Sequence, residues 1–63
     1  MKKLKELRIS KNIKIKEMAE LLNISEPFYS QIENKKRTLT YKLAKQIATI
    51  LNVKPDDLFF DEF

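Results

Sequence analysis

The side chains with the most versatile hydrogen-bonding chemistry lie close together in this chain. Ser30, Gln31 and Asn34 carry hydroxyl and amide groups, which both donate and accept hydrogen bonds. The basic run Lys35-Lys36-Arg37 follows directly. His, Cys and Gly are absent, which removes the usual nucleophile–base pairs, the commonest nitrogen and sulfur metal ligands, and glycine-rich phosphate loops. The cluster is therefore suited to binding rather than catalysis, and we expect no enzymatic activity, no metal and no cofactor.

A helix over residues 26–33 would present these groups on one face. Helical spacing assigns five residues to that face or its edge: Glu26, Pro27, Ser30, Gln31 and Asn34. Tyr29 and Ile32 share the opposite, apolar face, and Ser25 is a suitable N-cap. A polar outer face alone is typical of any surface helix, so its meaning depends on the neighbouring elements.

A second short helix is predicted over residues 15–22, directly before the first. Its apolar residues recur at helical spacing: Ile15, Met18, Ala19 and Leu22. Asn23 then breaks the pattern. Helices this short are unstable alone in water, so the two must pack against each other, with the small Ala19 near their closest approach. Lys14 is a poor N-cap, and we expect a frayed or alternatively capped start.

The remaining pattern predicts helices over residues 2–11, 40–51 and 55–61. The four asparagines fall where an apolar helical pattern stops, and Asn tolerates the left-handed backbone that helix ends often need. They are Asn12, Asn23, Asn34 and Asn52. With no strand pattern visible, residues 1–63 are expected to form one all-α domain, a compact five-helix bundle.

The window from Ile15 to Asn34 resembles the helix-turn-helix of the lambdoid phage repressor and Cro family, also called XRE-like regulators. Ala19, Asn23, Tyr29 and Ile32 stand at four of the positions that characterise the motif. The family's IENGKR run appears here as IENKKR, residues 32–37. The resemblance extends from Leu4 to Phe59. It implies a DNA-binding fold whose second motif helix, residues 26–33, enters the major groove.

In that setting the polar face would contact base edges. Gln31 can pair with adenine, Ser30 can donate or accept, and Glu26 could accept from cytosine N4. Glu26 alternatively only complements the helix dipole. Pro27 either touches a thymine methyl or stiffens the helix start, and Phe28 is either a DNA contact or core filler.

The resemblance also implies phosphate contacts from the loop after residue 33, where the family grips the DNA backbone. The expected phosphate-contacting residues are Lys14, Lys16, Asn34, Lys35, Lys36 and Arg37. Relatives often have Gly where Lys35 stands, so either Lys35 or Asn34 must adopt the left-handed backbone. Ile15 replaces a phosphate-binding Gln of many relatives, which removes one familiar contact or simply extends the core.

Two further features concern structure and assembly. Arg8 and Glu33 match a family pair that forms a salt bridge, although an unrelated surface placement is an alternative. Phe60 and Phe63 are surplus to a small core and, with Val53 beside them, are expected at a dimer interface. Alternatively Phe60 folds inward and Phe63 belongs to a disordered tail.

The charge is uneven along the chain. Net charge is +4, with twelve Lys or Arg against five acids in residues 1–53, and one Lys against four acids in residues 54–63. A basic body favours a phosphate-bearing partner, although ordinary solvated charge is the plainer interpretation. No apolar run reaches the ~20 residues of a membrane span, and no signal sequence is apparent, so a cytoplasmic protein is expected.

Together these features predict a sequence-specific regulator of transcription, a repressor that binds a palindromic operator on double-stranded DNA as a homodimer. One alternative is an antitoxin that binds both DNA and a toxin. Another is a protein-interaction module that has lost DNA binding, as Ile15 and Glu26 would suggest.

Overall fold

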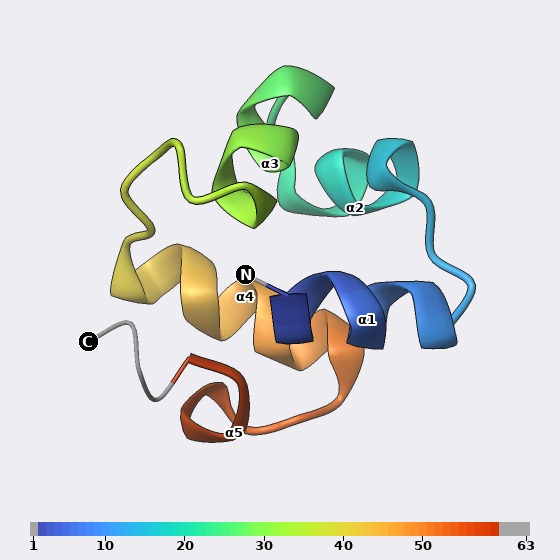
Figure 1. The fold of residues 1–63 in the computed structure, drawn as a ribbon, viewed down its shortest axis with the longest axis vertical. Coiled ribbons are helices and arrows are strands. Elements are labelled where there is room, and N and C mark those ends of the chain that lie inside the picture. Colours follow the sequence, from blue (N-terminus) through green and yellow to red (C-terminus); the bar gives the residue numbers. More distant parts are fainter. Residues whose placement is uncertain (1, 60–63) are drawn as a thin grey trace.

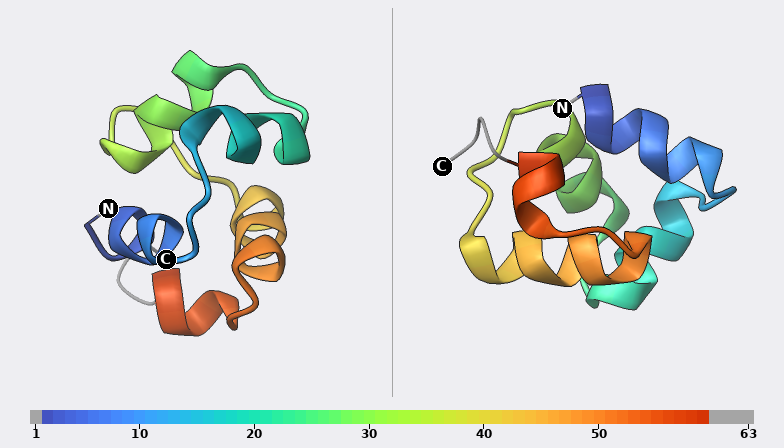
Figure 2. Two further views of the ribbon diagram at one scale, coloured as in Figure 1. Left: turned by 90° about the vertical axis from the view of Figure 1, so that its right-hand side faces the viewer. Right: turned by 90° about the horizontal axis from the view of Figure 1, so that it is seen from below.

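The computed structural model describes residues 2–59, which form an all-α bundle (Figure 1). The described helices are α1 (Lys2–Ser10), α2 (Ile15–Leu22), α3 (Glu26–Glu33), α4 (Tyr41–Leu51) and α5 (Pro55–Phe59). Figure 2 shows α2 and α3 together on one side of the molecule, with α1, α4 and α5 on the other. None of the helices in residues 2–59 has the length and apolar character needed to cross a membrane.

The core lies between these two groups of helices. Its largest fully buried side chains come from every helix: Leu4, Met18, Tyr29, Ile32, Ile47, Leu51 and Phe59. Fully burying one such side chain contributes about 1.5–3 kcal/mol. Helices α2 and α3 pack against each other, and each also contacts the layer below, α2 through α4 and α3 through α1. The short α3 is therefore held from two sides, which fixes the direction of its exposed face.

Helix starts follow local side-chain chemistry. The Ser25 hydroxyl accepts from the Phe28 N–H at 3.2 Å, and the Thr40 hydroxyl accepts from the Leu43 N–H at 3.2 Å. At α2 the predicted alternative cap is present, because the Glu17 carboxylate accepts from the backbone N–H of Lys14 at 3.2 Å. Lys14 has no side-chain oxygen to cap the helix, and the Glu17 side chain instead reaches back to the backbone N–H of Lys14, as in one half of a capping box.

Asparagine ends three helices in the left-handed conformation, but not the fourth. The φ angles of Asn12, Asn23 and Asn52 are 58°, 59° and 58°. Asn34 instead has φ −93° and ψ 10°, and Lys35 takes the left-handed conformation with φ 57°. The alternatives for the end of α3 are thereby resolved in favour of Lys35. The left-handed residue follows α3 by two positions, as Asn12 follows α1, whereas Asn23 and Asn52 come directly after α2 and α4.

The predicted bounds of α2 and α3 agree with the structure, and those of the other three helices differ at one end. Helix α1 ends at Ser10 rather than residue 11, and α4 begins at Tyr41 with Thr40 as its N-cap. Helix α5 is described to Phe59, so the predicted extension to residue 61 lies outside the described residues. The predictions for Phe60 and Phe63 fall outside them as well.

Candidate nucleic-acid interface

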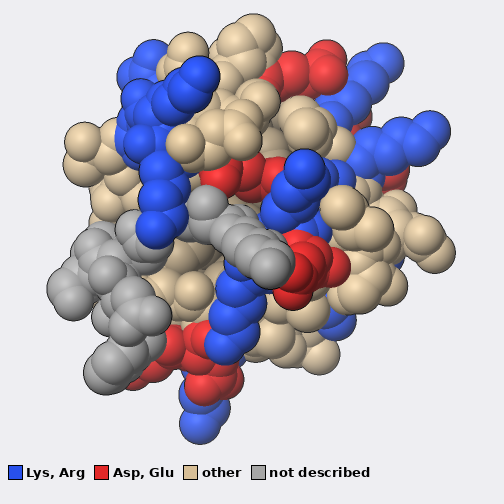
Figure 3. Space-filling model, viewed as in Figure 1, with Lys and Arg blue, Asp and Glu red and all other residues tan. Residues whose placement is uncertain are grey.

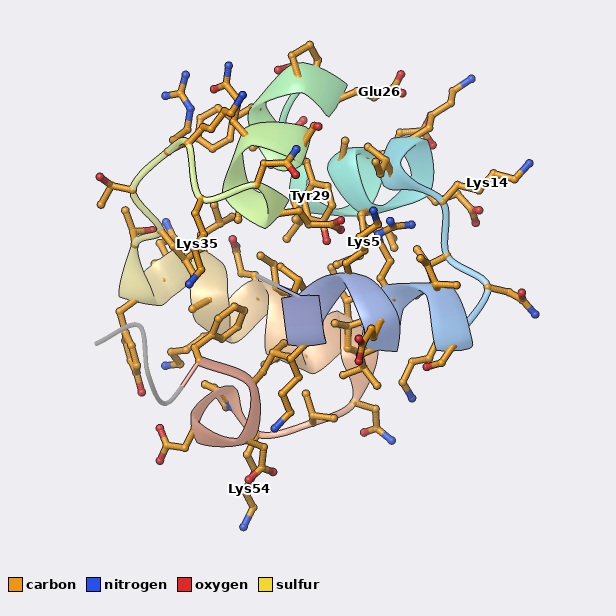
Figure 4. All side chains as sticks on the ribbon, in the orientation of Figure 1. Lys5, Lys14, Glu26, Tyr29, Lys35 and Lys54 are labelled. Atoms are coloured by element: carbon orange, nitrogen blue, oxygen red, sulfur yellow. The ribbon has the colours of Figure 1, made fainter. Side chains whose placement is uncertain are left out.

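Helix α3 has a buried side and an exposed side. Tyr29 and Ile32 are completely buried, whereas Glu26 and Pro27 are exposed at the helix start. Figure 4 shows Glu26 pointing away from the bundle and Tyr29 lying inside it. The exposed side of α3 is therefore available to a large partner, and its register is set by the buried side.

The middle of α3 presents side chains that are partly exposed. Ser30 and Gln31 are half-buried, and Phe28 is half-buried against the core. At the helix end the Asn34 side-chain amide donates to the Ser30 carbonyl at 2.9 Å and reaches the Ser30 Oγ at 3.4 Å. Asn34 thus helps to close the last turn of α3, a role in addition to its predicted contact with phosphate.

Cationic side chains lie on both sides of α3. Lys14 and Lys16 are exposed at the start of α2, and Lys35, Lys36 and Arg37 are exposed in the loop after α3. Figure 3 shows Lys and Arg gathered over that loop and again beside α2. Lys54 lies beside α5, at the end of the molecule opposite α3, and its side chain projects outward there (Figure 4). Two groups of cations spaced across a protruding helix are suited to the two phosphate walls of a groove.

Arg37 also contacts α3 itself, which sequence reasoning did not foresee. Its guanidinium carbon lies 4.3 Å from the centroid of the Phe28 ring. Its Nε donates to Gln31 Oε1 at 2.9 Å. Phe28 therefore packs on the core and also supports a cation, and three residues expected to contact DNA separately form one connected unit.

A buried ion pair braces α3 from beneath. Arg8 Nε donates to Glu33 Oε2 at 2.6 Å and Arg8 Nη2 to Glu33 Oε1 at 3.3 Å, with each residue only 6% exposed. Arg8 Nη1 also donates to the Ile13 carbonyl at 2.7 Å. Arg8 thus joins α1, the α1–α2 loop and α3, and it is committed to this task rather than exposed to a partner.

The electrostatics of this pair extend to Tyr29. Hydrogen bonding to the Glu33 carboxylate raises the pKa of Arg8 despite the opposing effect of burial. Burial, reinforced by the Glu33 carboxylate, raises the pKa of the Tyr29 hydroxyl far above its usual value. That hydroxyl is buried and makes no hydrogen bond of ordinary geometry. Tyr29 is therefore a neutral component of the brace at physiological pH.

Other residues singled out in the sequence lie away from this surface or in the core. Ile15 is partly buried against the core, which agrees with core extension. Val53, a predicted dimer residue, is also partly buried there. A hollow of about 590 Å³ lies between α2 and α4, and none of the residues predicted to contact DNA lines it. Residues 2–59 contain no group of acidic, His or Cys side chains suited to hold a metal.

Comparison with known protein families accounts for this arrangement. A family model described as helix-turn-helix matches residues 4–58, well over half of the chain. Comparisons with curated proteins and with solved structures give no match. The matched region contains the α2–α3 pair, its buried brace and both groups of cations. The chain therefore belongs to the XRE-type helix-turn-helix family of DNA-binding regulators.

Proposed function

We propose that this protein is a transcriptional repressor that recognises a two-fold symmetric operator as a homodimer. The observation that carries the proposal is the placement of α3: its inner face is fully buried, and its exposed polar face lies between two groups of cations. A rigid helix flanked by phosphate-binding groups is the arrangement that major-groove recognition requires.

The proposed contacts divide into two classes. Lys14, Lys16, Lys35 and Lys36 bind phosphates and supply attraction that is independent of sequence, with Asn34 and Arg37 assisting them. The residues on or beside the exposed face of α3 contact base edges and supply specificity: Glu26, Pro27, Phe28, Ser30 and Gln31. Arg8 and Glu33 keep α3 in register but do not contact DNA.

Dimerisation completes the proposal. A single module buries only about 600–1,000 Å² on DNA, which is little for tight and specific binding. Two protomers double the contacts and set half-sites about one helical turn apart. The proposed dimer contacts are Phe60, Phe63 and Val53, because two neighbouring aromatic residues on a very small domain are suited to an intermolecular contact.

The test begins with in vitro selection of bound duplexes followed by sequencing. The proposal requires an enriched motif consisting of two inverted half-sites. Gln31→Ala should then lower affinity for that site by about 1–3 kcal/mol while sparing random DNA.

Lys36→Ala is the matched control from the adjoining loop. It should weaken binding to all sequences alike, because a phosphate contact carries no sequence information. Equal losses on specific and random DNA for Gln31→Ala would remove this residue from base reading. Failure to enrich any motif would contradict the proposed function as a whole.

A further inference from the structure

Arg37 lies against α3 although the loop that carries it is exposed. Its guanidinium stacks on Phe28, 4.3 Å from the ring centroid, and its Nε donates to Gln31 Oε1 at 2.9 Å. Stacking and a directional hydrogen bond are the two interactions for which a planar guanidinium is best suited. Phe28 and Gln31 are half-buried, whereas Arg37 and its hydrogen bond to Gln31 are exposed to solvent.

These contacts determine which end of the Gln31 amide faces outward. A guanidinium only donates hydrogen bonds, so the atom facing Arg37 must be the amide oxygen. The amide nitrogen of Gln31 makes no hydrogen bond within residues 2–59. Gln31 therefore keeps its donor for a partner, while one of the two lone pairs on its amide oxygen already accepts from a cation.

This orientation conflicts with adenine recognition. A glutamine reads adenine by accepting from the N6 amino group and donating to N7. With Arg37 in place, the N6 amino group would have to share the Gln31 oxygen with a guanidinium, so that two donors crowd one acceptor atom. Guanine instead presents two acceptors, N7 and O6. Two donors, one from the Gln31 amide and one from the Arg37 guanidinium, match that pattern.

We propose that Arg37 is a specificity-determining residue, which converts Gln31 from an adenine reader into part of a donor-only unit that selects guanine. Phe28 is the platform that holds the guanidinium in position. The inference rests on the proposed function, because it assumes that α3 reads base edges. It replaces the adenine pairing expected for Gln31 from its residue type alone.

The test compares the motifs selected from random duplexes by five proteins: wild type, Gln31→Ala, Arg37→Ala, Arg37→Lys and Lys36→Ala. Loss of selectivity in Gln31→Ala identifies the base pair that Gln31 reads. At that pair the wild type should prefer guanine over adenine by about tenfold, within the range of a bidentate contact. Arg37→Ala should reverse the preference to adenine, because it restores the amide oxygen as an acceptor.

The other two variants separate shape from charge. Arg37→Lys keeps the charge but lacks the planar guanidinium and its Nε donor, so it should also lose the guanine preference. Lys36→Ala removes one charge from the same loop, and Lys36 makes no side-chain hydrogen bond to Gln31 within residues 2–59. It should bind more weakly overall and retain guanine.

Three outcomes would overturn the inference while leaving the proposed function intact. They are adenine at the Gln31 position in the wild type, an unchanged base in Arg37→Ala, and a uniform loss of affinity in that variant. The last would mean that Arg37 only grips phosphate. Failure of all five proteins to enrich any motif would contradict the proposed function, and the inference with it.

Discussion

At the scale of single residues, the pair Arg8 and Glu33 shows how a buried charge can serve a binding surface that it does not touch. Desolvation makes an unpaired charge expensive, so removal of either partner of a buried pair typically costs about 3–5 kcal/mol. The two parallel contacts and the third bond to the Ile13 carbonyl occupy the guanidinium on several sides. Such geometry orients α3 more strictly than apolar packing alone.

We therefore expect Arg8→Ala and Glu33→Ala to be strongly coupled in stability. Each should be destabilising, and a double-mutant cycle should give an interaction of about 1–3 kcal/mol, because the two groups share one buried network. Denaturant unfolding of the four proteins provides the measurement. Arg8→Ala combined with Lys54→Ala, whose side chain points away at the far end, serves as the additive control. Additivity in the Arg8–Glu33 cycle would contradict the brace.

We expect Tyr29 to make the stability of the protein sensitive to alkaline pH, because its folded pKa is raised by burial. The unfolded phenol ionises at a pKa of about 10, and the folded pKa is higher because of burial and the Glu33 carboxylate. Above about pH 10 the unfolded state therefore binds fewer protons than the folded state. Stability should fall as pH rises, by up to about 1.4 kcal/mol per pH unit, whereas below pH 10 this contribution is fully retained.

The measurement uses a Tyr41→Phe variant, in which Tyr29 is the remaining tyrosine. Its phenolate absorbance should appear only together with loss of the helical circular dichroism signal. A Tyr29→Phe protein should lack the steep alkaline decline, and comparison with it cancels the titration of the lysines. Ionisation of Tyr29 in a fully helical protein would show that the hydroxyl is not held in a buried, neutral state.

At the scale of elements, the end of α3 carries backbone strain that the other helix ends avoid. Asn, which accepts left-handed angles comparatively well, occupies that conformation after three other helices. After α3 the conformation falls on Lys35. The Lys35 side chain contributes charge to the loop. Its Cβ causes the strain, because left-handed backbone angles bring Cβ close to a carbonyl oxygen.

Lys35→Gly should therefore stabilise the fold by up to about 1 kcal/mol. Glycine removes the cost of a left-handed residue with a Cβ, and the greater freedom of the unfolded chain offsets part of that gain. The matched control is Lys36→Gly, which removes the same charge from a position whose φ is not positive. That change should destabilise instead. Both variants should bind DNA more weakly, because each removes one of the cations proposed to bind phosphate. Equal stability effects in the two proteins would argue against the strain.

The helices themselves were predictable because their signals are local. Apolar spacing, the Ser25 and Thr40 caps, and asparagine at helix ends all act within a few residues, and they predicted the bounds to within a residue except at the described end of α5. The pairing of Arg8 with Glu33 joins positions 25 apart. It was expected only through resemblance to a known family.

The contact of Arg37 with Gln31 and Phe28 had no signal in the sequence. It depends on the path of the loop after α3, and that path depends on which residue takes the left-handed turn. Periodicity does not report on such a turn. The polar face of α3 was therefore predictable as a set of residues, but the hydrogen bonds within that set were not.

At the scale of the whole molecule, acidic and basic side chains are spread unevenly over the surface. Helix α5 begins with Asp56 and Asp57 in its first turn, whereas exposed cations flank α3 at the other side of the bundle. A phosphate-bearing partner would be attracted most strongly to the side of the bundle that carries α3. This polarity orients the protein during encounter, before specific contacts form.

Binding to duplex DNA should consequently depend steeply on salt. Each neutralised phosphate contributes about −0.9 to the slope of log K against log salt, so we expect roughly −4 to −8 for a dimer. Lys36→Ala should flatten the slope by about one unit for each bound protomer. Lys54→Ala should leave the slope unchanged, because the Lys54 side chain projects outward beside α5, at the end of the molecule opposite α3. Affinity that stays constant between about 50 and 200 mM salt would exclude phosphate-driven binding.

The last prediction concerns assembly. Phe59, the last described residue, is buried in the core with an exposure of 1%. Two further aromatic residues, Phe60 and Phe63, follow in the sequence, and we propose that they form the dimer contact. We expect Phe60→Ser combined with Phe63→Ser to convert a wild-type dimer into a helical monomer with weaker operator binding. Sedimentation and circular dichroism would establish the two states.

The paired control is Leu21→Ser combined with Tyr41→Ser. Leu21 and Tyr41 are also exposed apolar residues, but they line the hollow between α2 and α4. If loss of surface hydrophobicity were enough to dissociate the dimer, both double variants would become monomeric. If Phe60 and Phe63 form the interface, only their double variant will become monomeric. The control will still bind the full operator with two protomers. A wild type that is monomeric both in solution and on DNA would rule out the homodimer, since half-site spacing would then have no structural basis.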